Sequence, residues 1–457
     1  MSLWTSSDIA AATGGSASAD FAVSDIAFDS REVGQGDLFV ALKGEATDGH
    51  RFLDQCFAQG AAGALVSVAT DYPHVLVENT ATALDALARA SRARTQAKII
   101  GVTGSVGKTG TKEALFAALE RGARGQAHRS VKSYNNHTGV PLSLARMPAG
   151  TRFGVFEMGM NHAGELAALT RIVRPHIALV TTIAPAHTAF FSGEEAIADA
   201  KGEIFQGLEP GGTAIVPFDS PHRDRLIAAA TPYAGQVVTF GSGVGADVRA
   251  IEAMPVSSGG TFVTARLDDR EVSYTISQAG AHWVSNTLAV LAAVRAAGGD
   301  LALAGLALAE LEGLAGRGAR FTIRRGGGEA LVIDESYNAN PASMRATLAV
   351  LGQEKTARKL VVLGEMRELG DDSDAYHAAL AEPLRAAGVE AGILVGKSMA
   401  PLANVLEGQG DFVHVADAAA ARERLRALLA AGDAVLIKGS NGVGLSAVVA
   451  ALRSGIG

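Results

Sequence analysis

Cysteine, aromatic residues and clustered positive charge are all scarce in this sequence of 457 residues. The single cysteine, Cys56, excludes an internal disulfide and a cysteine-rich zinc site, and it fits a reducing compartment. No block of lysine or arginine stands out and the formal net charge is −7, which argues against nucleic acid as a partner. There is no apolar run of about 18 residues, and the N-terminus has no basic segment followed by an apolar core. These absences predict a soluble, cytoplasmic protein with neither a membrane span nor a signal peptide.

The residues that are abundant are small and apolar. Hydrophobic residues make up 48% of the chain but aromatic residues only 5%, because alanine, glycine and valine dominate. This composition favours α/β layers in which helices pack closely on sheets. Because one domain usually holds about 100–200 residues, the length suggests about three domains.

The chain is organised around the stretch Gly101–Thr109. A short apolar run before it predicts a buried strand, and Gly110–Leu119 predicts a helix. A strand, a glycine-rich turn and Gly-Lys-Thr at the start of a helix bind phosphates, because backbone N–H groups and the helix N-terminus converge on an anion. Lys108 would then reach the β and γ phosphates, and the Thr109 hydroxyl would hold Mg²⁺. Val102 stands where the strict motif has glycine, so the loop is a variant, and an ordinary strand-to-helix turn is the alternative.

Shifts in composition divide the chain into three predicted domains. A polar segment ends the first domain (1–94), and a glycine-rich run separates the second (95–314) from the third (315–457). Short apolar strands alternate with helices in the second and third domains. This alternation predicts two mostly parallel sheets, the second of them Rossmann-like and without a phosphate loop. Alternating patterns within 234–276 predict an antiparallel ribbon inserted in, or appended to, the second domain.

Two predicted strands of the second domain lead to candidate metal ligands. Phe153–Gly159 carries Glu157, and Ile177–Ile183 ends shortly before His187. Ligands gather outside the carboxyl ends of parallel strands, so both side chains are expected to face the phosphate loop. The alternatives are a glutamate that caps a helix and a histidine that is packed or lies at the surface. By spacing alone, Lys201 on the following helix is an exposed residue in weak ion pairs.

Five motifs spread over the chain match one family: Thr103–Thr109, Glu157–His162, Ala186–His187, Lys201–Ile204 and Asp334–Pro341. In combination they resemble the Mur ligases of peptidoglycan synthesis over nearly the whole chain, although any one of them alone would be unspecific. The Asp334–Pro341 block, with Gly364–Gly370 and Asp29–Arg31, is most similar to the member that joins D-alanyl-D-alanine to UDP-N-acetylmuramoyl-tripeptide. The Asp-Asn-Pro-Arg element that is typical of the tripeptide-forming relative is not found in the last domain.

The resemblance implies a mechanism. ATP phosphorylates the terminal carboxylate of the tripeptide, the amine of the dipeptide attacks the acyl phosphate, and phosphate leaves the tetrahedral intermediate. Catalytic roles are implied for Lys108, His187 and Lys201, the last carbamylated by carbon dioxide. Two Mg²⁺ ions are implied, one held by Thr109 and Glu157 and the second by His187, with the Lys201 carbamate as a further oxygen ligand.

The same resemblance assigns residues to the two nucleotides. It implies a small N-terminal domain that binds the UDP end of the substrate through Ser30, Arg31, Lys43, Asp48, Gly49 and His50. It implies that ATP is bound by Gly104, Ser105, Val106, Gly107, Lys108, Thr109, Asn286, Arg320, Asp334 and Asn338, and that Asn135 and Asn136 line the central cleft. Arg320 matches a phosphate-contacting arginine, for which Arg317 is the rival, and Asp334 matches a ribose ligand. For Asn338, a plain turn is the alternative.

Two positions depart from the family pattern. The family reads His-Asn where this chain has His282-Trp283, and Trp283 can either stack on adenine or pack inward. The family also favours Thr-Asn where this chain has Thr181-Thr182. Neither change removes a metal or phosphate ligand, so activity is expected.

Two other functions compete with this hypothesis. One is another amide ligase of the superfamily, such as the tripeptide-forming enzyme or a folylpolyglutamate synthase. The Asp29–His50 elements and the Asp334–Pro341 block argue against both. The other is a nucleotide-switched binding protein, which would not need Lys201 beside His187 and Glu157. A monomer is expected by default, and the domains of the ligase are expected to close when ligands bind, because the implied ATP and UDP-sugar contacts lie on three separate units.

Overall fold

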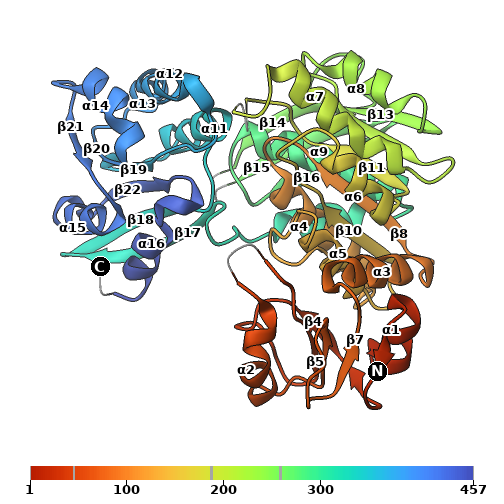
Figure 1. The fold of residues 1–457 in the computed structure, drawn as a ribbon. Coiled ribbons are helices and arrows are strands. Elements are labelled where there is room, and N and C mark those ends of the chain that lie inside the picture. Colours follow the sequence, from red (N-terminus) through yellow and green to blue (C-terminus); the bar gives the residue numbers. More distant parts are fainter. Residues whose placement is uncertain (1, 45–46, 186–188, 257–259, 456–457) are drawn as a thin grey trace.

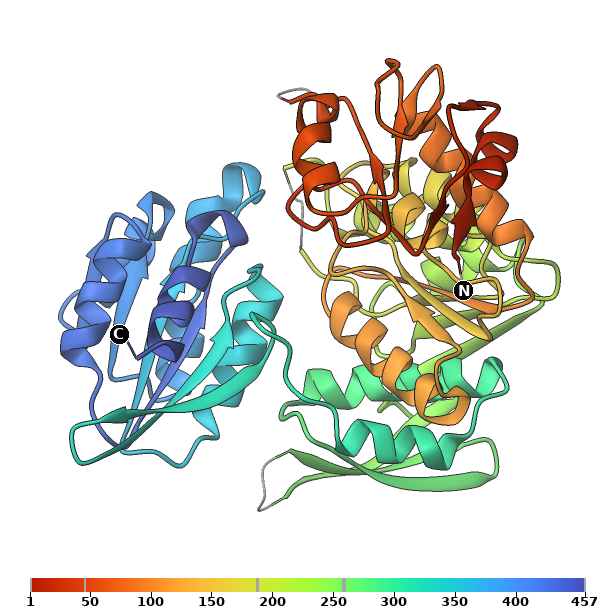
Figure 2. The ribbon, with the colours of Figure 1, turned by 90° about the horizontal axis from the view of Figure 1, so that it is seen from below.

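The computed structural model describes residues 2–44, 47–185, 189–256 and 260–455. The chain forms three α/β units in succession, each with its own sheet, and the C-terminal unit is set apart from the other two (Figure 1 and Figure 2). Most strand pairs are parallel, and the predicted α/β fold class is confirmed. In the part of the chain that the structure describes, no helix combines the length and apolar character that crossing a membrane requires.

The N-terminal unit is a five-stranded sheet of order β2-β7-β6-β5-β4. Its strands are β2 (Ser16–Ala17), β4 (Asp25–Ala27), β5 (Asp37–Val40), β6 (Gly63–Val66) and β7 (His74–Leu76), and a separate ribbon pairs β1 (Trp4–Thr5) with β3 (Ala22–Val23). Its helices are α1 (Ser6–Thr13), α2 (Leu53–Ala58) and α3 (Thr80–Ala93), with the 3-10 helix η1 (Gly49–Phe52). Because β4 to β7 run parallel, the loops after β4 and β5 lie at the same edge of the sheet.

The central unit is a nine-stranded sheet of order β16-β15-β14-β13-β12-β11-β8-β10-β9. Its strands are β8 (Lys98–Thr103), β9 (Ala127–Arg129), β10 (Phe153–Glu157), β11 (Ile177–Val180), β12 (Thr213–Pro217), β13 (Gln236–Gly241), β14 (Val248–Pro255), β15 (Thr261–Leu267) and β16 (Arg270–Ile276). Its helices are α4 (Lys108–Ala123), α5 (Gly139–Ala145), α6 (Glu165–Val173), α7 (Glu194–Gly202), α8 (Arg223–Ala230), α9 (Ala281–Ala296) and α10 (Leu301–Ala309), with η2 (Glu203–Gly207).

The strand before the phosphate loop, β8, is buried on both faces, as its continuous apolar sequence predicts. Ile100 and Val102 belong to a core shared with α4, α9 and α10, whereas Ile99 belongs to a second core with α5, α6 and α7. The predicted antiparallel ribbon is found only in part. Strands β13 and β14 continue the parallel sheet from β12, and only the pairings of β15 with β14 and of β16 with β15 are antiparallel. Alternating burial marks a half-buried strand but not its direction, which explains the difference.

The C-terminal unit is a six-stranded sheet of order β17-β18-β22-β19-β20-β21 in which only β17 is antiparallel. Its strands are β17 (Ala319–Arg325), β18 (Gly328–Glu335), β19 (Arg358–Gly364), β20 (Ala391–Val395), β21 (Asp411–Val415) and β22 (Asp433–Lys438). Its helices are α11 (Pro341–Gly352), α12 (Ser373–Ala378), α13 (Ala381–Ala386), α14 (Ala400–Leu406), α15 (Ala418–Leu428) and α16 (Ser446–Arg453), with η3 (Gly370–Asp372), η4 (Lys397–Met399) and η5 (Asn441–Val443). The edge strands β17 and β21 are not predicted from the sequence, because neither is a continuous apolar run.

Candidate active site

The phosphate loop joins the end of β8 to the start of α4, and its backbone requires two of its glycines. Gly104 has φ +146° and Gly107 has φ +90°, which residues with side chains rarely adopt. A Cβ atom on Gly104 would lie 1.9 Å from the Thr181 hydroxyl, and one on Gly107 would lie 2.7 Å from Asn286 Oδ1. Because glycine has no side chain with which to cap α4, the N–H groups of the first turn can bind an anion.

Lys108 begins α4, and its ammonium group folds back over the loop. Its Nζ donates a 2.7 Å hydrogen bond to the carbonyl of Gly104. Burial lowers the pKa of Lys108, while the carboxylate of Glu157 favours its charged form. Thr181 braces the loop from the end of β11, since its hydroxyl donates to the carbonyl of Val106 at 2.6 Å. The ammonium of Lys108 is therefore placed where the oxygens of an anion could replace this backbone carbonyl.

Glu157, at the end of β10, is a buried carboxylate that is only 1% exposed. Thr109 Oγ1 donates to its Oε2 at 2.9 Å, and Asn135 Nδ2 donates to its Oε1 at 2.8 Å. A hydroxyl and a carboxylate beside a phosphate loop fit Mg²⁺, which takes oxygen ligands and shares them with phosphates and water. No cluster of three or more His, Cys, Asp or Glu residues suited to a metal occurs in the described ranges.

Lys112, one turn further along α4, is completely buried beneath this carboxylate. Its ammonium donates to the carbonyls of Lys132 at 2.5 Å and Ser130 at 3.3 Å, and lies 3.9 Å from Glu157 Oε2. A buried cation at this position offsets the buried negative charge of Glu157. No motif points to Lys112, but it follows Lys108 by four residues and so shares its face of the helix.

Lys201, in the last turn of α7, is buried and not the exposed residue that its spacing suggests. Burial and the positive charge of Lys108 hold the pKa of Lys201 well below its usual range. No acidic side chain of the described residues offsets its charge. The neutral amine is therefore favoured at this position. The predicted metal ligand His187 lies outside the described residues.

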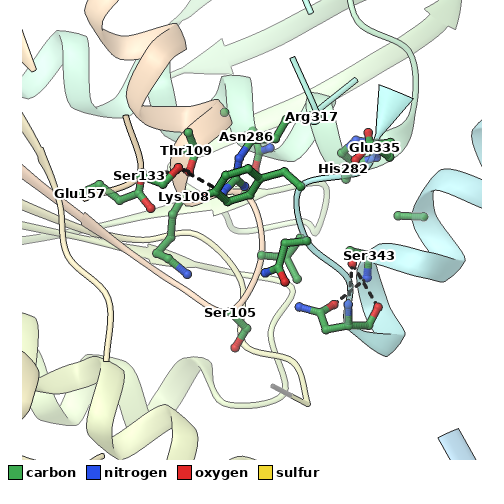
Figure 3. Close-up of a pocket in the computed structure, with 18 of the residues that line it drawn as sticks. Ser105, Lys108, Thr109, Ser133, Glu157, His282, Asn286, Arg317, Glu335 and Ser343 are labelled. Atoms are coloured by element: carbon green, nitrogen blue, oxygen red, sulfur yellow. Dashed lines mark hydrogen bonds between the residues drawn. The ribbon is translucent and has the colours of Figure 1, made fainter. Parts of the chain in front are cut away.

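A cavity of about 290 Å³ lies between the central and C-terminal units (Figure 3). The phosphate loop and the start of α4 form one wall, together with Asn135 and Glu157. The opposite wall comes from the linker at 316–317, the ends of β18 and β22, and α11. Figure 3 shows Lys108 and Glu157 on one side of this space and Glu335 on the other.

The C-terminal wall carries a buried ion pair that sequence motifs do not reveal. Lys438, 2% exposed at the end of β22, donates to the carbonyl of Asn338 at 2.9 Å and lies 3.5 Å from Glu335 Oε2. Burial raises the pKa of Glu335 and lowers the pKa of Lys438, and each group partly offsets the effect on the other. With Lys108 opposite, the cavity has a cation on each wall, which suits a polyphosphate.

Three family models match successive parts of the chain. They are described as Mur ligase family, catalytic domain (residues 22–96), Mur ligase middle domain (residues 102–294) and Mur ligase, glutamate ligase domain (residues 319–441). A protein of Escherichia coli (strain K12) named UDP-N-acetylmuramoyl-tripeptide–D-alanyl-D-alanine ligase is 35% identical over 439 residues, which cover 95% of each chain. The chain belongs to the Mur ligase family. The resemblance noted in the sequence is thereby confirmed.

Solved structures of other Mur ligases extend the similarity to the fold. MurF from Acinetobacter baumannii is 30% identical, with a TM-score of 0.84 over 99% of each chain. MurF from Thermotoga maritima, solved in complex with ADP, is 26% identical, with a TM-score of 0.77 over 94% of this chain and 97% of that one. Both likenesses span all three units.

The structure of this Mur ligase separates the two candidate arginines. Arg317 lines the cavity, where its guanidinium donates to Ser133 Oγ at 3.2 Å and lies 4.2 Å from the centre of the Tyr337 ring. Arg320 lies on the exposed face of β17, outside the cavity, and donates to Glu354 Oε2 at 2.7 Å. Arg317, and not Arg320, is therefore the arginine that lines the cavity.

Two more predicted residues of the Mur ligase do not line this cavity, and their oxygens accept hydrogen bonds within the fold. Asp334 is buried at the end of β18, where it accepts hydrogen bonds from the Gly316 N–H at 2.8 Å and the Ser336 hydroxyl at 2.7 Å. It thereby holds the linker between the central and C-terminal units. Asn136 Oδ1 accepts from the N–H groups of Thr138 and Gly139 at the start of α5. Asn338, Asn286 and Asn135 do line the cavity.

The unusual Trp283 of this Mur ligase packs inward while one side of it lines the cavity. A Cβ atom on Gly110 would lie 3.0 Å from its indole ring, so the ring covers the first turn of α4. Its neighbour His282 also lines the cavity, and burial, with the charge of Lys438, lowers the pKa of His282 to about 4. Asn286, one turn later on α9, packs closely against the phosphate loop at Gly107.

The candidate UDP-binding residues follow the carboxyl ends of two neighbouring parallel strands, β4 and β5. Ser30 and Arg31 follow β4, and the Arg31 guanidinium bonds Asp29 at 2.6 and 2.8 Å. Lys43, Asp48, Gly49 and His50 follow β5. His50 bonds Asp48 through Nδ1 at 2.6 Å and accepts the Ser67 N–H on Nε2 at 2.9 Å, so both of its ring nitrogens shape the loop. Gly49 packs against the backbone of Leu42, where a Cβ atom would come within 2.8 Å.

Proposed function

We propose that this Mur ligase joins D-alanyl-D-alanine to UDP-N-acetylmuramoyl-tripeptide in an ATP-dependent reaction of peptidoglycan precursor synthesis. The observation that carries the proposal is the cavity in which Lys108, Thr109 and Glu157 face the C-terminal wall. Similarity over 95% of the chain to a relative with that name supports the choice of substrates. An ADP complex of a related structure supports the use of ATP.

The reaction must bring a triphosphate and a carboxylate together against their like charges. The γ-phosphoryl group passes from ATP to the terminal carboxylate of the tripeptide, the dipeptide amine attacks the acyl phosphate, and inorganic phosphate leaves as the amide forms. Lys108 and the N–H groups at the start of α4 would stabilise the negative charge on the transferred group. The cations Arg317 and Lys438 on the other wall are suited to the same task.

The chemistry also implies metal ions, for which the chain offers suitable residues. Thr109 and Glu157 would hold Mg²⁺ on ATP, where it supplies charge neutralisation. We infer that Lys201 is carbamylated and, with His187, holds a second ion. A carbamate forms when the neutral amine attacks carbon dioxide and loses a proton, and the burial of Lys201 supports that neutral form. Carbamylation thereby replaces the positive charge of the lysine ammonium with the negative charge of the carbamate.

We propose further that the three units divide the ligands among them. The unit 1–94 would bind UDP through the loops after β4 and β5, which share one edge of its sheet. The unit 95–314 would bind the phosphates of ATP, and the unit 315–457 would complete the nucleotide site through Asn338 and Arg317. We infer a cytoplasmic monomer, in keeping with these nucleotide substrates.

Release of phosphate from Mg·ATP tests the proposal. Phosphate should appear only when UDP-N-acetylmuramoyl-tripeptide and D-alanyl-D-alanine are both present, and Lys108→Ala should abolish it. Release with the UDP-dipeptide and a single diamino acid would instead identify the tripeptide-forming activity. Turnover that needs neither substrate would support a nucleotide-switched binding protein and overturn the proposal.

A further inference from the structure

Residues 130–136, which we call the strap, enclose the end of β10 that carries Glu157. The Glu157 N–H donates to Ser130 Oγ at 2.9 Å, and Asn135 Nδ2 donates to Glu157 Oε1 at 2.8 Å. The Gly159 N–H then donates to the carbonyl of Asn135 at 2.8 Å. The strap therefore contacts the candidate metal ligand Glu157 at both the backbone N–H and the carboxylate of Glu157.

The inner side of the strap is fixed by the buried Lys112. Its ammonium donates to the carbonyls of Ser130 and Lys132, and it pairs with Glu113 Oε1 at 2.9 Å. Lys132 has φ +48°, a left-handed conformation that is uncommon for a residue with a side chain. This conformation directs its carbonyl inward to Lys112 while its side chain extends outward and stays exposed.

The outer side of the strap contacts the N-terminal unit through the carboxylate of Glu32 and the ring of Phe28. Glu32 Oε1 accepts a 2.9 Å hydrogen bond from the Tyr134 hydroxyl and forms an ion pair with the Lys132 ammonium. The rings of Tyr134 and Phe28 lie 5.2 Å apart and pack beside this pair. Burial and the bond to Glu32 raise the pKa of Tyr134 to about 12, so the hydroxyl remains a donor.

Glu32 belongs to the same loop after β4 as the candidate UDP ligands Ser30 and Arg31. The side chain of Arg31 is 83% exposed, and its contact with Asp29 leaves it accessible to an anion. A ligand held by Ser30 and Arg31 would order this loop and, through Glu32, the strap. Groups distant in the chain, at 30–32 and at 157, are thus joined by a continuous series of contacts.

We propose that Glu32 is a positioning residue through which the bound UDP-sugar orders the strap, and with it Glu157 and Asn135, for the metal–nucleotide complex. The inference rests on the proposed function, because it needs UDP at the loop after β4. Since coupling between two sites is reciprocal, the UDP-sugar tightens binding of the metal–nucleotide complex and that complex tightens binding of the UDP-sugar.

The test compares two affinities in each protein. Binding of Mn²⁺·ADP is measured by electron paramagnetic resonance with and without saturating UDP-N-acetylmuramoyl-tripeptide, so that no turnover occurs. We expect the UDP-sugar to tighten binding in the wild type by about fivefold or more. Glu32→Ala and Lys132→Met should each reduce this ratio at least about threefold, and the double variant should reduce it no further than either alone. Tyr134→Phe, which keeps the ring against Phe28, should reduce the ratio in the same direction.

A matched control is Glu78→Ala, which removes an exposed carboxylate of the same unit and should leave the ratio as in the wild type. A role of Glu32 in folding alone would lower the melting temperature or both affinities without changing their ratio, and would overturn the inference. So would a wild-type ratio near one. Calorimetric titration of the UDP-sugar separates the two failures, because a wild type that binds Mn²⁺·ADP but gives no binding heat with the UDP-sugar would refute the proposed function, and the inference with it.

Discussion

The Thr109 hydroxyl and the Glu157 carboxylate, 48 residues apart in the chain, meet in a hydrogen bond of 2.9 Å. The bond joins the first turn of α4 to the end of β10, so the two oxygens are held beside the phosphate loop by the sheet itself. Both are ligands of the kind that Mg²⁺ prefers. The metal dependence of the enzyme should therefore respond to either residue.

The first prediction concerns this pair. Thr109→Val removes the hydroxyl at nearly constant volume, and we expect it to raise the Mg²⁺ concentration needed for half-maximal activity by about tenfold or more. Thr109→Ser retains the oxygen and should stay close to the wild type. The measurement is the ligase rate against Mg²⁺ at fixed ATP. Equal Mg²⁺ dependence in the Val and Ser variants would show that the hydroxyl is not a ligand.

The second prediction separates Arg317 from Arg320. Arg317→Ala should raise KM for ATP by about tenfold or more, because a cation in the cavity is lost. Arg320→Ala should change it by less than about twofold, since this guanidinium makes an ion pair with Glu354 outside the cavity. Initial rates against ATP at saturating second and third substrates decide between them. The reverse order of effects would mean that the cavity is not the ATP site.

Local sequence patterns suffice for the phosphate loop and for the strand that carries Glu157. A continuous apolar run, glycines at constrained positions and a lysine at the helix start are all encoded within a few residues. Lys201 is different, because its burial follows from the packing of α7 against the sheet and not from its own spacing. The family resemblance, and no local signal, pointed to it.

The choice between Arg317 and Arg320 depended on a strand that is not predicted from the sequence. In β17, exposed and buried positions alternate, and Arg320 falls on the exposed face. Lys438 was missed for a related reason. It meets Glu335 because β22 lies beside β18, and strand order in a parallel sheet is not readable from the strands themselves.

The third prediction is that replacing Lys201 with an apolar residue stabilises the folded protein but abolishes most of its ligase activity. Its pKa is lower in the folded than in the unfolded chain, so burying Lys201 costs free energy at neutral pH. In buffer free of carbon dioxide and metal, Lys201→Met should raise the free energy of unfolding by about 1 kcal/mol or more. Its ligase activity should fall by about 100-fold or more. Urea denaturation and the ligase assay measure the two effects.

Two further variants make the Lys201 prediction specific. Lys201→Ala should be similarly inactive and should recover part of its activity when short carboxylic acids are added, because these can take the place of the carbamate. Lys98→Met, at an exposed lysine at the start of β8, should leave both activity and stability near those of the wild type. Full activity of Lys201→Ala without any added acid would disprove the proposed role of a carbamate on Lys201.

The last prediction concerns acid stability. His128 in β9 bonds the carbonyl of Ser143 at 2.7 Å, and burial lowers the pKa of His128 to about 4. In the unfolded chain this histidine takes up a proton as the pH falls below about 6.5, whereas in the folded chain it stays neutral until the pH approaches about 4. The free energy of unfolding therefore decreases as the pH falls from about 6.5 toward about 4. Between pH 7.5 and pH 5, the free energy of unfolding should fall by about 2 kcal/mol less in His128→Gln than in the wild type. Urea denaturation at both pH values measures this difference, and His137→Gln, at an exposed histidine, should follow the wild type. Parallel losses in all three proteins would mean that His128 protonates without opposing folding.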